Sequence, residues 1–145
     1  EALLSSDIRL DVEMDPAAGI VRCDPDRMEQ ALKSLVLNAS DAMPAGGRIA
    51  IRTSVHENAK NEFWTAVTVT DSGRGIDNPT LRNLFEPGHS GVPGRNAGIG
   101  LPSVASILEQ HQGHVEVESQ PGKGSSFHLL LPRAASVKAR AFVRR

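Results

Sequence analysis

An asparagine, an aspartate and two pairs of glycines are the residues of this sequence whose types and surroundings could bind a ligand. Asn38 lies in a predicted helix with Ser34 four residues before it, so both side chains project from one face. The amide oxygen of Asn38 could bind Mg²⁺, a hard cation that prefers oxygen ligands and retains waters and substrate phosphates. An asparagine on a helix surface, with no ligand, is the alternative interpretation.

Asp71 follows an apolar strand and opens a turn that holds glycines at positions 73 and 75. A carboxylate at the end of a buried strand accepts hydrogen bonds well and could bind an exocyclic amine of a ligand base. Gly73 and Gly75 would let such a ligand approach the backbone. The alternative is an aspartate that only begins a turn.

Gly98 and Gly100 precede a predicted helix that begins near Leu101. Free backbone amides at a helix start bind anions, so phosphates could lie there; a flexible loop meeting a helix is the alternative. The sequence has no G-x-x-x-x-G-K-[ST] stretch, which excludes a P-loop. The glycine pairs are also too short for the dinucleotide-binding fingerprint.

Hydrophobic periodicity predicts the elements that would position these residues. We expect Asp24 to cap the first helix and Asn78 to cap the second. The predicted strands are residues 8–14, 20–23, 49–55, 63–69, 115–119 and 127–131, and the predicted helices are 25–43, 78–85 and 101–112. This order predicts a two-layer α/β sandwich with a mixed, mainly antiparallel sheet rather than a doubly wound fold. The glycine-rich residues 86–100 are expected to form a functional loop.

Composition excludes several classes of protein. Hydrophobic residues make up 39% and charged residues 23% of the chain, as in ordinary globular proteins. No apolar run approaches the roughly 20 residues of a transmembrane helix, and there is no signal peptide, so we expect no membrane contact by this domain. A single cysteine, Cys23, excludes an internal disulfide and indicates a reducing, cytoplasmic location. Four Phe, one Trp and no Tyr count against nucleic-acid binding.

The two ends of the chain carry their own expectations. The chain begins with Glu1 rather than Met, which indicates a fragment of a longer protein. Residues 133–145 hold five basic side chains and no acidic one. We interpret them as a tail or linker after a domain of residues 1–132; contact with a partner or nucleic acid is the alternative.

Taken in order, the motifs resemble the sequence boxes of sensor histidine kinase catalytic domains. Residues 24–44 resemble the asparagine box, 71–76 the first glycine box, 84–87 the phenylalanine box, 98–101 the second glycine box, and 113–132 the closing strand pair. The resemblance covers about residues 5–132. It implies the Bergerat ATP-binding fold, with about three helices over one face of the sheet, and ATP and Mg²⁺ as ligands.

The resemblance also implies roles for individual residues. Asn38 would hold Mg²⁺, Asp71 would take the adenine amine, and Gly73 and Gly75 would shape the base pocket. Ser126 would supply a hydroxyl that helps to bind adenine. Gly98 and Gly100 would contact phosphates, and Asp41, Ile76, Phe85 and Leu101 complete the expected nucleotide-binding set.

Two departures from the family pattern stand out. Ser34 occupies a place where the family usually has a second asparagine, which would make Ser34 an additional metal ligand. Residues 88–92 read Gly-His-Ser-Gly-Val where relatives usually carry Phe-Phe-Thr-Thr-Lys, so the lysine of the ATP lid is missing. His89 or Arg95 could supply its charge to the phosphates; both are otherwise solvated loop residues.

The sequence therefore predicts a histidine kinase catalytic domain that binds Mg-ATP and donates the terminal phosphate to a histidine. That histidine would lie on a separate dimerisation domain of the same parent protein, with a response-regulator receiver domain downstream. Two alternatives remain: a regulatory module of the same fold that has lost efficient ATP use, and an anti-sigma-type serine kinase. A parent protein anchored in the membrane is compatible with this cytoplasmic location of the domain.

Overall fold

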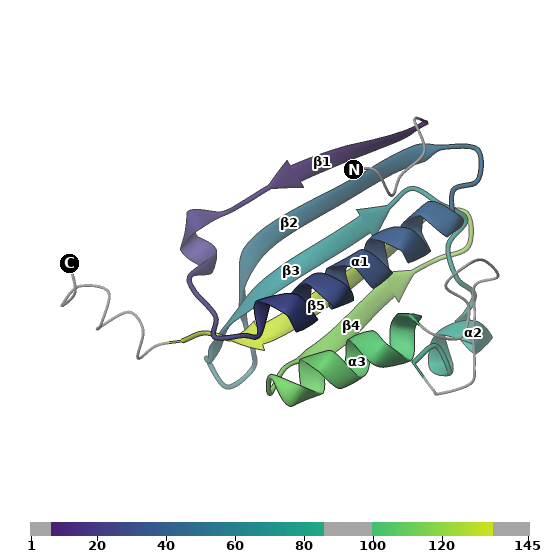
Figure 1. The fold of residues 1–145 in the computed structure, drawn as a ribbon. Helices are drawn as coiled ribbons and strands as arrows, with labels where there is room; N and C mark the ends of the chain where they lie inside the picture. Colours follow the sequence, from purple (N-terminus) through teal and green to yellow (C-terminus); the bar gives the residue numbers. More distant parts are fainter. Residues whose placement is uncertain (1–6, 86–99, 135–145) are drawn as a thin grey trace.

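Five strands form one mixed sheet in the computed structural model, which describes residues 7–85 and 100–134 (Figure 1). The strands are β1 (Ile8–Glu13), β2 (Gly47–Glu57), β3 (Phe63–Asp71), β4 (His114–Ser119) and β5 (Ser125–Pro132). Their order across the sheet is β1-β2-β3-β5-β4. β1 runs parallel to β2, whereas every other neighbouring pair is antiparallel. The predicted mixed, mainly antiparallel sheet is confirmed.

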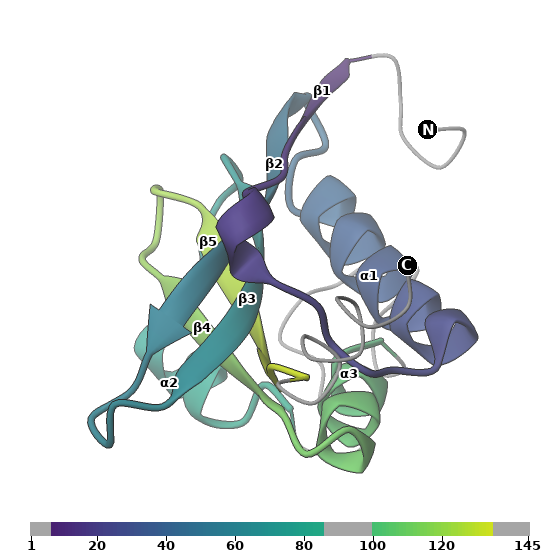
Figure 2. The same ribbon diagram turned by 90° about the vertical axis from the view of Figure 1, so that its left-hand side faces the viewer.

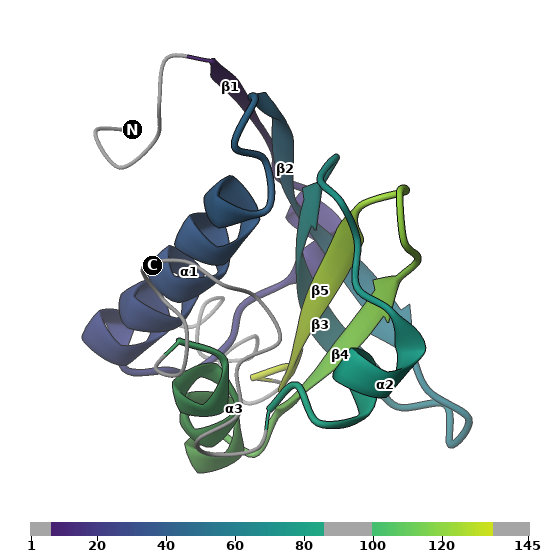
Figure 3. The same cartoon turned by 90° about the vertical axis from the view of Figure 1, so that its right-hand side faces the viewer.

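The helices are unequally distributed around this sheet. They are η1 (Pro16–Ala18), a 3₁₀ turn, and the α-helices α1 (Pro25–Asp41), α2 (Asn78–Arg82) and α3 (Gly100–Gln110). α1 and α3 lie side by side and cover one face, whereas α2 lies near β4, away from the other two (Figures 2 and 3). Within the described ranges, no helix is long and apolar enough to cross a bilayer.

Strand alternation separates a packed face from an open face of the sheet. Ile49, Val69, Phe127 and Leu129 are each at most 2% exposed and belong to the core beneath α1 and α3. Asp71 has the same parity as Val69, so its side chain lies on the packed face where β3 ends. The fold therefore places this carboxylate at one end of the hydrophobic core.

The predicted strand at residues 20–23 is wrong: this segment is an irregular connection into α1. Its polar backbone groups bond elsewhere, because the Ile20 carbonyl accepts from Ala134 N–H at 2.9 Å. The N–H of Asp24, where the connection meets α1, donates to Nε2 of His111 at 3.0 Å. Contacts distant in sequence, which periodicity does not report, thus replace a strand ladder.

The helix starts confirm one predicted cap and correct the other. Asp24 caps α1, since its carboxylate accepts from the N–H groups of Asp26 and Arg27. Asp77, not Asn78, caps α2, and its Oδ1 accepts from Thr80 N–H at 2.9 Å. The two neighbouring residues are both good capping types, so sequence alone did not separate them.

Candidate functional site

Asp71 is a buried carboxylate at the end of the central strand β3, and it is 5% exposed. Its Oδ1 accepts from Gly73 N–H at 2.8 Å, and a backbone hydrogen bond from Ser125 also reaches the carboxylate. Burial raises the pKa of Asp71, and these two hydrogen bonds only partly oppose that rise. A buried carboxylate with capacity for further donors is suited to bind a hydrogen-bond donor of a ligand.

The turn after Asp71 packs against the C-terminal end of α1. Arg74 N–H donates to the Ala42 carbonyl at 3.3 Å. A Cβ built on Gly73 would lie 2.6 Å from that carbonyl oxygen and 2.9 Å from Oδ1 of Asp71. Glycine at position 73 is therefore required for the close approach that joins Asp71 to α1.

Asn38 lies one helical turn before this junction, and its carbonyl accepts from Ala42 N–H at 3.2 Å. The residue is only 8% exposed, yet within the described residues its side-chain amide has no hydrogen-bond partner. A buried amide without a partner is costly, so this arrangement fits a side chain that meets a ligand or a cation. Ser34, one turn earlier, and Asp41, at the end of α1, are half-buried.

The donor set restricts how a cation could be held here. Across the part of the chain that the structure describes, no three His, Cys, Asp or Glu side chains form a group that could hold a metal ion. An amide oxygen such as that of Asn38 suits Mg²⁺, which is bound through few protein ligands together with substrate phosphates and waters. The residues present therefore fit a magnesium ion that arrives with a phosphorylated ligand.

The hairpin between β4 and β5 packs on the glycine turn from the other side. Gly75 has a φ of +75°, and a Cβ on it would collide with the Gln120 carbonyl. Gly122 N–H donates to the Arg74 carbonyl at 2.7 Å. Ile76, which ends the turn, is 6% exposed. The turn is thus fixed between α1 and the hairpin.

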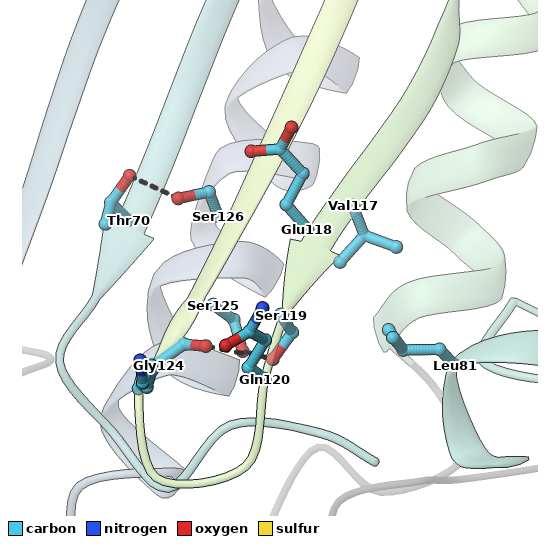
Figure 4. A pocket seen from close by; sticks show the side chains of 10 residues that line it. Thr70, Leu81, Val117, Glu118, Ser119, Gln120, Gly124, Ser125 and Ser126 are labelled. Carbon is cyan, nitrogen blue, oxygen red and sulfur yellow. Dashed lines mark hydrogen bonds between the residues drawn. The ribbon is translucent and has the colours of Figure 1, made fainter. Parts of the chain in front are cut away.

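Ser126 does not lie where the resemblance implied. It is on the open face of the sheet, where its Oγ is 2.9 Å from Oγ1 of Thr70 (Figure 4). Ser125 pairs with Asp71 in the β3–β5 register and is 6% exposed. Because strand neighbours point to opposite faces, the hydroxyl on the Asp71 side belongs to Ser125. Period two, counted back from the buried Phe127, would have identified it.

A surface hollow of about 580 Å³ lies near this hairpin (Figure 4). Its lining includes Thr70, Leu81, Glu118 and Ser126, but not Asn38, Asp71 or Gly73. Ser119 and Ser125 also line this hollow, whereas the Asp71 carboxylate and the Asn38 amide do not. The hollow therefore borders the candidate site at these two serines, while Asp71 and Asn38 lie outside it.

Of the remaining residues expected at the site, some lie in the described part of the chain and others lie outside it. Gly100 and Leu101 begin α3 and are buried. Phe85 is half-buried and meets Phe127 edge to face, with ring centroids 6.3 Å apart. The structure thus brings Asn38, Asp71, Gly73, Gly75 and Ile76 together around one junction, with Gly100 and Leu101 on the neighbouring helix. His89, Arg95 and Gly98 lie outside the described residues.

Comparison with known proteins shows that the chain is similar to bacterial kinases. It is 37% identical to the sensor histidine kinase ZraS of Escherichia coli (strain K12) over 128 residues, which cover 88% of this chain and 26% of the relative. It is 30% identical to sporulation kinase E of Bacillus subtilis (strain 168), covering 88% of this chain and 16% of the relative. The chain thus spans about a quarter or less of the length of these relatives.

Solved structures give the same result for the fold. The mycobacterial sensor histidine kinase MprB aligns with a TM-score of 0.71 at 28% identity, covering 88% of this chain and 83% of that one. A nucleotide-free catalytic domain of histidine kinase ThkA aligns with a TM-score of 0.72 at 26% identity, covering 88% and 80%. These neighbours confirm the Bergerat-type fold. Residues 23–135 match the family description directly, and the chain belongs to the histidine kinase-, DNA gyrase B- and HSP90-like ATPases.

Proposed function

We propose that this chain is the catalytic, ATP-binding domain of a two-component sensor histidine kinase. It binds Mg-ATP and presents the terminal phosphate to a histidine on a separate dimerisation domain of the parent protein. The observation that carries the proposal is the buried carboxylate of Asp71 beside a helix end that holds the buried Asn38 amide, which has no partner among the described residues. The sensor histidine kinases among the relatives support it.

Asp71 selects the base in this proposal. As a carboxylate it only accepts hydrogen bonds, so it pairs with the exocyclic amine of adenine. Guanine presents a carbonyl oxygen at the same ring position, and two acceptors would face each other in a buried site. Gly73, Gly75 and Ile76 form the wall against which the base lies, and Ser125 takes the place first given to Ser126.

The phosphates lie between α1 and the start of α3. The amide oxygen of Asn38 holds Mg²⁺, with the Ser34 hydroxyl as a second ligand one turn away. The bound magnesium neutralises triphosphate charge. Gly100 contributes a backbone N–H group at the α3 N-terminus, and the sequence assigns a further phosphate contact to Gly98 and a positive charge to His89 or Arg95.

The chain contributes positioning and charge rather than a covalent side chain. In transfer, the bond between the terminal phosphorus and its bridging oxygen breaks, ADP leaves, and a phosphorus–nitrogen bond forms on the acceptor imidazole. His56, His114 and His128 lie in strands, and both ring nitrogens of His111, after α3, are hydrogen-bonded. We therefore assign the phosphoacceptor histidine to another domain. In the same proposal, a receiver domain acts downstream, and the reaction takes place in the cytoplasm.

The test has two stages. A fluorescent ATP analogue is titrated with and without Mg²⁺, and saturable, magnesium-dependent binding is expected. Labelled ATP is then supplied together with the parent's dimerisation domain, and an acid-labile phosphoprotein is expected. An acid-stable product would favour the serine-kinase alternative. No saturable signal at millimolar nucleotide would favour the regulatory module, for which Ser34 and the altered residues 88–92 are the motivation.

A further inference from the structure

Ser119, the last residue of β4, is the centre of a hydrogen-bond network between the hairpin and the glycine turn. Its Oγ lies 2.8 Å from the Ile76 nitrogen, 2.9 Å from the Gly124 carbonyl oxygen and 2.8 Å from Oγ of Ser125. The side chain is half-buried on the packed face. One hydroxyl therefore connects three backbone segments around the base pocket.

The proton count in this network is fixed by its partners. A hydroxyl has one proton and two lone pairs. Ile76 N–H can only donate to Ser119, and the Gly124 carbonyl can only accept from it. The second lone pair of Ser119 then takes the proton of Ser125, so that Ser125 Oγ can only accept from a ligand. Ser125 is the register partner of Asp71, and the pocket thus presents two acceptors from adjacent strands.

The same network fixes the position of the glycine turn relative to the β4–β5 hairpin. Gly75 contacts the Gln120 carbonyl, and Gly124 contacts the Asp71 carbonyl, each too closely for a side chain. Ile76 follows directly and is buried, so its N–H needs a partner once water is excluded. Ser119 supplies that partner through a side chain. Its loss would release both the turn and the orientation of the Ser125 hydroxyl.

We propose that Ser119 is a positioning residue that sets base selectivity: it holds Ile76 and orients the Ser125 hydroxyl so that the pocket accepts, and does not donate, at the base. This inference rests on the proposed function. Ser119 itself has no expected contact with the ligand, and it acts on the same site through Ile76 and Ser125.

The experiment compares ATP with inosine triphosphate, which carries a carbonyl in place of the adenine amine. Calorimetry with Mg²⁺ is carried out on the native chain, Ser119→Ala and Ser119→Thr. We expect Ser119→Ala to weaken ATP binding about fivefold to tenfold, which is the scale of one lost hydrogen bond. The binding of inosine triphosphate should weaken by less than about twofold. Ser119→Thr, which keeps the hydroxyl, should restore the native ratio. Thr68→Ala is the matched control, because it removes a 2.9 Å hydroxyl bond to His128 on the open face.

An unchanged ratio of the two affinities in Ser119→Ala would overturn the inference, as would native ATP binding by that variant. Failure of the native chain to bind ATP at all would instead overturn the proposed function. If Ser119→Ala does not fold, amide exchange of the native chain decides the network. The Ile76 amide is then expected to exchange more slowly than the neighbouring Gly75 amide, and equal rates would contradict the Ser119 bond.

Discussion

Asp71 is a carboxylate buried at the end of the central strand β3. The side chain is 5% exposed, and its burial raises its pKa although two backbone N–H groups approach it. The surroundings of Asp71 therefore disfavour its charged form in the folded chain. A buried acceptor of this kind is expected where a ligand, rather than the protein, completes the hydrogen bonding.

Replacing Asp71 with Asn should separate the effect of this carboxylate on stability from its effect on adenine binding. The neutral amide keeps an oxygen for Gly73 N–H, so the melting temperature at pH 7 should equal or exceed that of the native chain. Adenine binding should weaken by about 1–3 kcal/mol, because an amide can present a donor to the base amine. Calorimetry and thermal melts measure the two quantities. Asp77→Asn is the control, since Asp77 caps α2 and Asn is an equally good cap.

The raised pKa of Asp71 also predicts a pH dependence. The folded chain takes up this proton at a higher pH than the unfolded chain, whose value is the ordinary 3.8. The contribution of Asp71 to stability is therefore largest below 3.8 and is lost as pH rises through the raised folded value. ATP affinity should change in the opposite sense, falling as pH falls and the carboxylate is protonated. The difference between the native and Asp71→Asn chains, measured by melts and titrations across pH, isolates this group; two parallel curves would contradict the assignment.

At the scale of elements, two backbone segments hold the glycine turn. Gly73 meets the Ala42 carbonyl at the end of α1, and Gly75 meets the Gln120 carbonyl at the hairpin. The turn therefore cannot shift without moving α1 or the β4–β5 hairpin. This explains how a loop can present Asp71 rigidly.

Gly73→Ala tests the contact with α1. The new Cβ would lie 2.6 Å from a backbone oxygen, so the turn must move away from α1. We expect a loss of about 1–3 kcal/mol in the free energy of unfolding, together with weaker ATP binding. Gly122→Ala is the control: nothing lies within 4 Å of its Cβ, and only its φ of +80° costs stability, about 1 kcal/mol. Denaturant unfolding compares the two variants. Equal losses in the free energy of unfolding would argue against the close approach of Gly73 to the Ala42 carbonyl.

Local pattern predicted most elements, and long-range contacts account for the errors. Alternation in residues 49–55 and 63–69 identified β2 and β3, because one face of each strand is buried. Residues 20–23 are also mostly apolar, yet Ile20 bonds Ala134 and the adjoining Asp24 bonds His111, contacts that no local pattern reveals. The parallel pairing of β1 with β2 likewise depends on α1 crossing between them.

The candidate site was predictable where residue type alone is informative. Asp71 ends an apolar strand and is buried as expected, and Asn38, identified from its type and its place in the helix, is buried as well. Ser125 was missed in favour of Ser126, although the alternation of β5 distinguishes their faces. Ser119 could not be found from sequence, because its three partners are brought together only by the packing of the hairpin on the turn.

At the scale of the whole molecule, the chain spans only part of the length of its relatives: 26% of ZraS and 16% of sporulation kinase E. The proposed transfer to a histidine would therefore use a dimerisation domain outside the chain described. In the proposed site, α1, the glycine turn and α3 would supply the base and phosphate contacts from within the domain.

Asn38→Ala should remove the magnesium dependence of ATP binding and abolish transfer to a supplied dimerisation domain. The reason is that Asn38 is the buried amide expected to hold the cation. Titrations with and without Mg²⁺ measure the effect. Asn83→Ala, an exposed asparagine after α2, serves as the control. Persistence of the full magnesium dependence in Asn38→Ala would show that the cation is held elsewhere.

A crystal structure of the chain with a non-hydrolysable ATP analogue and Mg²⁺ tests the central claim most directly. We expect the adenine amine within hydrogen-bond distance of the Asp71 carboxylate and the cation on the amide oxygen of Asn38. The claim is contradicted if the nucleotide occupies the hollow near Thr70 and Glu118 instead, or if protein atoms fill the space beside Asp71 and leave no room for a base.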